Sequence, residues 1–119
     1  MKKVEAIIRL SRFDEIRDEL ASIGVNFFTM SKVEGFGLEQ GDVIRYRGSE
    51  FNSNHVARLK LEILTTAEHI EAITNAIIKA GRTGEVGDGK ITILDVGQAV
   101  RIRTGEQGKD AILPANGSI

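Results

Sequence analysis

The stretch Arg58-Leu59-Lys60-Leu61-Glu62-Ile63-Leu64 alternates charged and aliphatic side chains. Successive side chains of a strand point to opposite faces of a sheet, so this pattern predicts a strand with one buried face. The three charged residues, Arg58, Lys60 and Glu62, then share the second face. Charged groups there need solvent, partners or a ligand.

The segment after this strand predicts a helix and then more strand. Thr65 followed by Glu68 is a capping-box pattern, which opens a helix. An apolar stripe at positions 70, 73 and 77 continues that helix until Gly81. The apolar run 91–96 predicts a strand covered on both faces, and residues 100–103 predict a short further strand.

The segment before it predicts a strand, a helix and a second strand. Residues 4–10 and 25–33 are rich in β-branched, aliphatic or aromatic residues, as strands are. Between them, Ser11 with Asp14 predicts a helix start, a stripe at positions 13, 16, 20 and 23 follows, and Gly24 ends the helix. The order β-α-β-β-α-β is the ferredoxin-like pattern, an α+β fold with both helices on one face of an antiparallel sheet.

The second face of this sheet carries more apolar residues than a monomer needs. Ile8, Leu64, Leu94 and Val96 add apolar surface beyond the requirement of one core face. We infer from them that the second face is buried in an oligomer.

Length, charge and composition exclude several classes of protein. The chain has 119 residues, which we interpret as one domain over 1–119, and its net charge of -1 gives no basic field for nucleic acid. Cysteine is absent, which excludes disulfides and thiolate metal sites. No apolar run reaches transmembrane length and the first residues lack a signal-peptide pattern, so we expect a cytoplasmic protein without direct membrane insertion.

A glycine-rich turn is the strongest candidate site. Thr83-Gly84-Glu85-Val86-Gly87-Asp88-Gly89-Lys90 lies between the predicted helix and strand, and such turns present several N–H groups to one anion. Arg101 and Arg103 alternate with apolar residues, so on a strand both guanidinium groups would leave the same side, roughly 7 Å apart. Arginine forks match phosphate oxygens, which points to an oligophosphate site. The alternative is a glycine-rich hairpin turn with two exposed arginines.

Residues 34–54 have no core pattern. They contain Gly35, Gly37, Gly41 and Gly48 together with many charges. Long segments of this kind inside a compact domain are commonly functional, the alternative being an exposed hairpin excursion. The tail from about 108 to 119 is expected to be flexible.

The sequence resembles the nitrogen regulatory protein PII family over nearly its whole length, from Met1 to about Asp110. The resemblance rests on Lys3–Ile8, Glu34-Gly35-Phe36-Gly37, Tyr46-Arg47-Gly48-Ser49-Glu50-Phe51, and Thr83–Lys90 with Arg101-Ile102-Arg103-Thr104-Gly105-Glu106. It implies a homotrimer that binds ATP and ADP in clefts between subunits. It also implies a T-loop, here about 37–54, which docks on a target protein such as an ammonium transporter or a metabolic enzyme. Members are signal transducers rather than enzymes.

The resemblance also implies which residues hold the nucleotide. The phosphates would be held by the turn and the arginines: Val86, Gly87, Asp88, Gly89, Lys90, Arg101 and Arg103, the arginines from the same or the neighbouring subunit. The T-loop base and two further residues would approach the nucleotide: Gly35, Phe36, Gly37, Thr29 and Glu62. Two alternatives stay open, that Asp88 only shapes the turn and that Glu62 is a surface partner of Lys60 or Arg58.

This chain departs from the family pattern at the T-loop base. An arginine and a glutamine of the usual pattern are Leu38 and Glu39 here, and a lysine that commonly pairs with 2-oxoglutarate is Arg58. Glu39 is a possible Mg²⁺ ligand, but its charge would repel the carboxylates of 2-oxoglutarate. We therefore expect weak or absent 2-oxoglutarate binding with ATP and ADP binding retained.

The T-loop itself differs in the partner-docking residues, which we take to be Tyr46, Arg47, Glu50 and Phe51. Phe51 stands where many members carry a tyrosine that is modified by nucleotidylation, so control by ligand binding is expected instead. The alternative function is a ferredoxin-like trimer that senses another small ligand or a metal without responding to nucleotides. The two histidines, His55 and His69, show no spacing typical of a transition-metal site.

Overall fold

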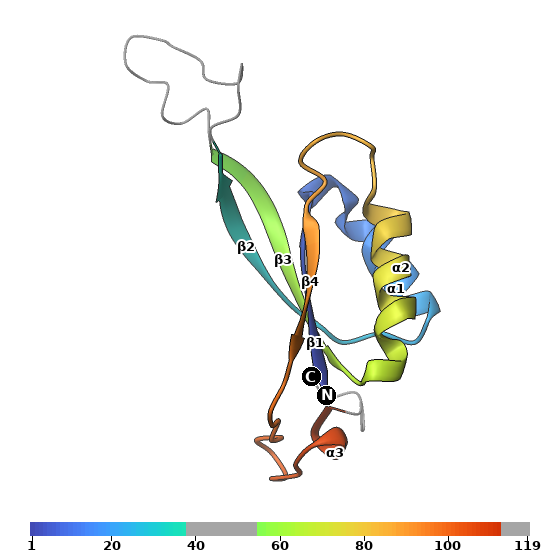
Figure 1. The fold of residues 1–119 in the computed structure, drawn as a ribbon, viewed down its shortest axis with the longest axis vertical. Coiled ribbons are helices and arrows are strands. Elements are labelled where there is room, and N and C mark those ends of the chain that lie inside the picture. The colour runs from blue at the N-terminus through green and yellow to red at the C-terminus, as the bar shows by residue number, and fades with distance from the viewer. Residues whose placement is uncertain (38–54, 113–119) are drawn as a thin grey trace.

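The computed structural model describes residues 1–37 and 55–112. Four strands, β1 (Lys2–Ile8), β2 (Thr29–Phe36), β3 (His55–Thr65) and β4 (Lys90–Asp95), form one antiparallel sheet in the order β2-β3-β1-β4. Two helices, α1 (Phe13–Ser22) and α2 (Ile70–Gly81), pack side by side on one face of the sheet (Figure 1). The expected ferredoxin-like α+β fold is confirmed.

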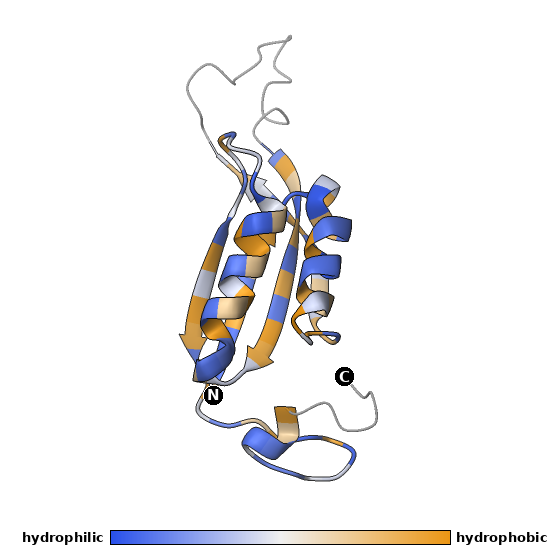
Figure 2. Cartoon of the chain, turned by 90° about the vertical axis from the view of Figure 1, so that its right-hand side faces the viewer, coloured by the Kyte–Doolittle hydropathy of each residue, from blue (hydrophilic) through white to orange (hydrophobic). Residues whose placement is uncertain are grey.

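The core lies between the two helices and the inner face of the sheet. Alternate residues of β1 and β3 are buried there, as the alternation of 58–64 predicts. The largest fully buried side chains come from both layers: Ile16, Leu20, Leu61, Ile73 and Val4. Figure 2 shows the same division, with polar residues on the outward sides of the helices.

Two helix starts differ from the predictions. Ser11 lies inside a short 3₁₀ turn, Leu10–Arg12, and gives α1 no side-chain cap. Thr65 is the last residue of β3, and Thr66, which precedes the following 3₁₀ turn, gives no side-chain cap, so the predicted capping box does not form. A second 3₁₀ turn, Ala67–His69, precedes α2, and the hydroxyl of Thr66 lies 3.1 Å from Nδ1 of His69.

The strand bounds also differ. β2 begins at Thr29 rather than 25 and extends to Phe36, because Val25 and Phe28 pack against the core instead of joining the sheet. Ile8 was expected on the second face but is buried in the core at 3% exposure. Leu64 and Leu94 do lie exposed, as expected of the second face.

The predicted strand at 100–103 does not form, and residues 102–104 make a turn. Only Val100 forms a bridge there, with Gln107. A one-turn helix, α3 (Lys109–Ile112), follows in a stretch for which no regular element was expected.

Candidate functional site

The turn between α2 and β4 closes around the carboxylate of Asp88. One carboxylate oxygen accepts hydrogen bonds from the backbone N–H groups of Thr83 and Gly84, both at 2.9 Å. The other accepts from the Thr83 hydroxyl and, at 2.9 Å, from Nε of Arg9. These bonds, with that from the Thr83 hydroxyl as the largest cause and that from Arg9 next, hold the pKa of Asp88 well below its usual range. The Asp88 carboxylate therefore shapes the turn, and a contact of this residue with phosphate stays a prediction.

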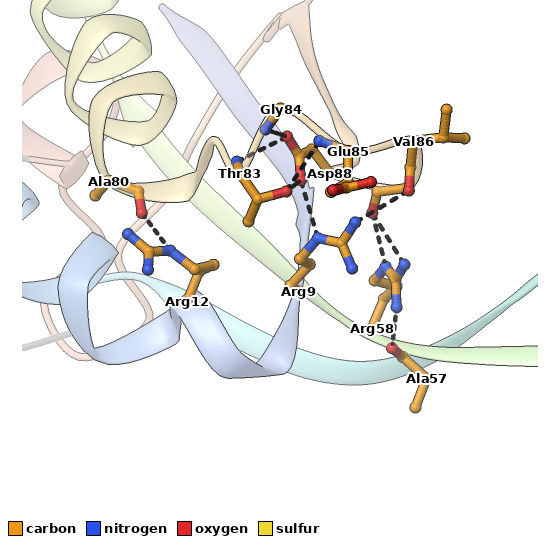
Figure 3. A network of polar contacts seen from close by, with 11 residues as sticks. Arg9, Arg12, Ala57, Arg58, Ala80, Thr83, Gly84, Glu85, Val86 and Asp88 are labelled. Carbon is orange, nitrogen blue, oxygen red and sulfur yellow. Dashed lines mark hydrogen bonds and ion pairs between the residues drawn. The ribbon is translucent and has the colours of Figure 1, made fainter.

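Two arginines from the sheet hold the carbonyl groups of the turn (Figure 3). Arg9, just after β1, donates to the carbonyl of Val86 at 3.0 Å. Arg58, in β3, donates to the carbonyl of Gly87 through Nη2 at 2.9 Å and Nε at 3.2 Å. Sequence reasoning missed Arg9, whose only signal was a charged residue directly after a buried strand. The sequence prediction connected Arg58 with 2-oxoglutarate. In the structure Arg58 donates three hydrogen bonds to backbone carbonyl groups, two to Gly87 and the third to Ala57 at 2.8 Å.

Two glycines of the turn have little room for a side chain. Gly87 and Gly89 both have φ of 101°, a conformation that L-residues rarely adopt. A Cβ at Gly89 would lie 1.7 Å from the carbonyl oxygen of Ile7, and one at Gly87 would lie 2.9 Å from Nη2 of Arg58. The turn therefore lies directly against β1, and Lys90 starts β4 in register with Ile7.

Lys90 lies exposed at the start of β4. No carboxylate of the residues 1–37 and 55–112 forms an ion pair with it. The turn thus offers one ammonium group and glycine backbone that an anion can approach closely.

A second group of predicted residues lines a cavity of about 770 Å³. Thr29, Glu62, Arg101 and Arg103 all contribute to its wall. Glu62 pairs with Thr29 in the register of β2 and β3, and its carboxylate accepts from Nζ of Lys3 at 3.0 Å. That hydrogen bond to Lys3 is the largest cause that lowers the pKa of Glu62.

The two arginines of this group differ in their surroundings. Nη2 of Arg101 donates to the carbonyl of Asp110 at 2.9 Å, and Nε lies 3.6 Å from a carboxylate oxygen of Glu106. Arg103 is exposed. Residues 102–104 form a turn, so the expected strand that carries both arginines is wrong, although both line the same cavity.

The predicted phosphate ligands therefore lie in two places within one chain. Lys90 is on β4, one edge of the sheet, whereas the cavity residues lie beside the segment that enters β2, the other edge. Thr29, Glu62, Glu5 and Thr92 form one row across the four strands. The row spans three interstrand steps, about 14 Å.

The remaining predicted residues belong to the end of β2 and beyond. Gly35 and Phe36 are in β2, where Phe36 is 63% exposed and packs edge-on against His55 at 5.3 Å between ring centroids. Gly37 is the last described residue before the gap. The predictions for Glu39, Tyr46, Arg47, Glu50 and Phe51 lie outside the described residues.

The second face of the sheet carries an ionic cluster beside its exposed apolar residues. Nζ of Lys3 lies 3.0 Å from carboxylate oxygens of both Glu5 and Glu62. These hydrogen bonds, that to Glu5 first, raise the pKa of Lys3. In the part of the chain that the structure describes, no group of three acidic or histidine side chains is arranged for a metal ion. No helix in that part is long and apolar enough to cross a membrane.

Comparisons with known proteins agree with one another. The family model described as nitrogen regulatory protein P-II matches residues 1–106. A relative from Microchaete diplosiphon named nitrogen regulatory protein P-II is 47% identical over 112 residues, 94% of this chain and all of the relative. One of the same name from Synechocystis sp. is 46% identical with the same coverage. The solved structure of Arabidopsis thaliana PII bound to citrate is 39% identical, with a TM-score of 0.77 over 92% of this chain and 90% of that one.

Proposed function

This chain belongs to the nitrogen regulatory protein P-II family, and on that basis we propose that it is a signal-transduction regulator that binds ATP and ADP between its subunits. It assembles as a homotrimer and controls a target protein through the segment 37–54. The target is a transporter or a metabolic enzyme. The chain performs no catalysis of its own.

The observation that carries the proposal is the separation of the predicted phosphate ligands. Lys90 and the glycine-rich turn lie at the β4 edge, and Arg103, Arg101 and Thr29 lie at the side of the sheet where β2 begins. A ring of copies in which the β4 edge of one chain meets the β2 side of the next would bring both groups to one ligand. The exposed side chains of Leu64, at 46%, and Leu94, at 37%, are the apolar surface that such an assembly would bury.

The chemistry of the two groups fits the parts of a nucleotide. Lys90 and the backbone of Gly87 and Gly89 offer a cation and close main-chain approach to the phosphates. The apolar cavity beside Thr29 and Glu62 accommodates the base and ribose. Glu39 is a candidate ligand for a Mg²⁺ ion bound with the phosphates.

Regulation follows as a population shift. ATP and ADP differ in the contacts that they make at the base of the segment 37–54, so each nucleotide favours a different conformation for the target to bind. The changes at Leu38, Glu39 and Arg58 are the basis for proposing weak or absent 2-oxoglutarate binding.

Calorimetric titration with ATP and with ADP, followed by 2-oxoglutarate in the presence of Mg-ATP, tests the proposal. We expect micromolar nucleotide affinity, no response to 2-oxoglutarate, and a loss of affinity in Lys90→Ala. The matched control is Lys79→Ala, because Lys79 is an exposed lysine of α2 that pairs with Glu19 instead of facing the turn. Absence of nucleotide binding by the wild-type protein would favour the alternative, a sensor of another small ligand.

A further inference from the structure

We propose that Arg9 and Arg58 are positioning residues, which orient two consecutive peptide groups so that the N–H groups of Gly87 and Asp88 face a bound phosphate. The inference rests on the proposed function and names the groups that prepare its phosphate-binding turn. It concerns the two arginines that contact the turn from the sheet.

Two consecutive carbonyl groups of the turn point toward the arginines. Arg9 donates a hydrogen bond to the carbonyl of Val86, and Arg58 donates one to the carbonyl of Gly87. In a planar trans peptide, the C=O of one residue and the N–H of the next point in opposite directions. The N–H groups of Gly87 and Asp88 therefore point away from the arginines.

These N–H groups are available. Among the described residues, neither one donates a hydrogen bond of good geometry, whereas the N–H groups of Thr83, Gly84 and Glu85 in the same turn all do. Two adjacent N–H groups that point to one side form an anion-binding concavity.

The ion pair between Arg9 and Asp88 decides the charge that the turn presents to a phosphate. Asp88 would repel a phosphate if its carboxylate were unpaired, but Nε of Arg9 lies 2.9 Å from that carboxylate. Arg9 thus neutralises Asp88 with one nitrogen and fixes the carbonyl of Val86 with another. Arg58 has no carboxylate partner among the described residues, so its charge adds to that of Lys90 near the turn.

Gly87 fits between the two guanidinium groups. A Cβ at this residue would lie 2.9 Å from Nη2 of Arg58 and 3.4 Å from Nη2 of Arg9. Both arginines therefore approach the same side of one glycine, and a side chain there would displace them.

The test combines ATP titration with NMR of the backbone amides in Arg9→Met and Arg58→Met. Arg17→Met is the control, since it removes one positive charge from an exposed side chain that pairs with Asp14 and Asp18 on α1. We expect ATP affinity to fall about tenfold or more in the two test variants, the effect of one lost hydrogen bond to a charged donor, and to stay within about twofold in the control. Arg58→Lys, which keeps one donor for the carbonyl of Gly87, recovers most of the loss.

The amide resonances separate positioning from a general effect on folding. In the wild type, ATP shifts the amide protons of Gly87 and Asp88 downfield, and in Arg58→Met the shifts are smaller although the melting temperature is retained. If Arg9→Met does not fold, Arg58→Met decides the question alone. ATP affinity within about twofold of wild type in the folded variants, or wild-type amides that do not respond to ATP, overturns the inference while the proposed function stands. A wild-type protein that binds no nucleotide overturns both.

Discussion

Gly89→Ala should destabilise the fold because this glycine lies against the backbone of β1. An added Cβ would lie 1.7 Å from the carbonyl oxygen of Ile7 and 2.8 Å from its carbonyl carbon. Neither atom can rotate away, since Ile7 belongs to β1 and pairs with both Lys60 and Lys90. The turn must therefore move away from β1, which disturbs the first residue pair between β1 and β4.

The magnitude follows from two separate terms. A non-glycine residue at positive φ costs about 1–2 kcal/mol, and Gly84→Ala isolates this term because Gly84 has φ of 90° with open space around it. Gly89→Ala adds the displacement of packed backbone, typically about 1–3 kcal/mol. We therefore expect a loss of roughly 2–5 kcal/mol for Gly89→Ala and of about 1–2 kcal/mol for Gly84→Ala.

Urea denaturation at one fixed protein concentration measures the difference, since an oligomer's stability depends on concentration. Equal losses in free energy of unfolding for Gly84→Ala and Gly89→Ala would refute the reasoning, because the steric term would then be absent. Circular dichroism of each folded variant provides the control that the native helix content is retained.

The remaining predictions concern the charge of Asp88 and the binding of ATP and 2-oxoglutarate. Because the pKa of Asp88 is depressed in the folded protein, its carboxylate stabilises the fold above the unfolded value of about 3.9 and the contribution is lost as pH falls below it. The difference in melting temperature between wild type and Asp88→Asn should therefore be full at neutral pH and shrink below about pH 4, and a difference independent of pH would contradict this. Arg103→Ala should weaken ATP binding about tenfold in calorimetry with an unchanged melting temperature, because Arg103 is exposed; a lower melting temperature with unchanged affinity would show a structural role instead. Glu39→Gln combined with Arg58→Lys should confer a 2-oxoglutarate response in Mg-ATP titrations. A double variant that does not respond would show that other residues prevent 2-oxoglutarate binding.

The parts of the fold that the sequence predicted well are those with one buried face. β3 alternates in charge because one side meets the core, and α2 repeats isoleucine for the same reason. β2 was misplaced because it is an edge strand with mainly exposed residues, so its sequence has no alternation to follow. The bounds of such a strand depend on pairing with β3, which is a property of the sheet.

The glycine-rich turn of the candidate site was predictable from the sequence, but the hydrogen bonds that Arg9 and Arg58 make to it were not. Three glycines and Asp88 mark the turn in the sequence, and their backbone angles agree with that prediction. The partner of Asp88 is Arg9, 79 residues earlier, and no local pattern connects the two. Residues 100–103 alternate like a strand, but in the described structure only Val100 forms a bridge, so the predicted strand was wrong although Arg101 and Arg103 both line one cavity.

The central claim is that one nucleotide is bound by two chains, and co-assembly of two defective variants tests it most directly. Lys90→Ala and Arg103→Ala are co-expressed with different tags, and mixed oligomers are purified through both tags and titrated with ATP. If each site combines Lys90 of one chain with Arg103 of its neighbour, one of the three sites in every mixed trimer recovers wild-type affinity, because a ring with both kinds of chain contains one neighbouring pair in which both contributing residues are intact. If both residues serve a site within one chain, every site keeps one defect and no wild-type affinity returns, which would contradict the claim.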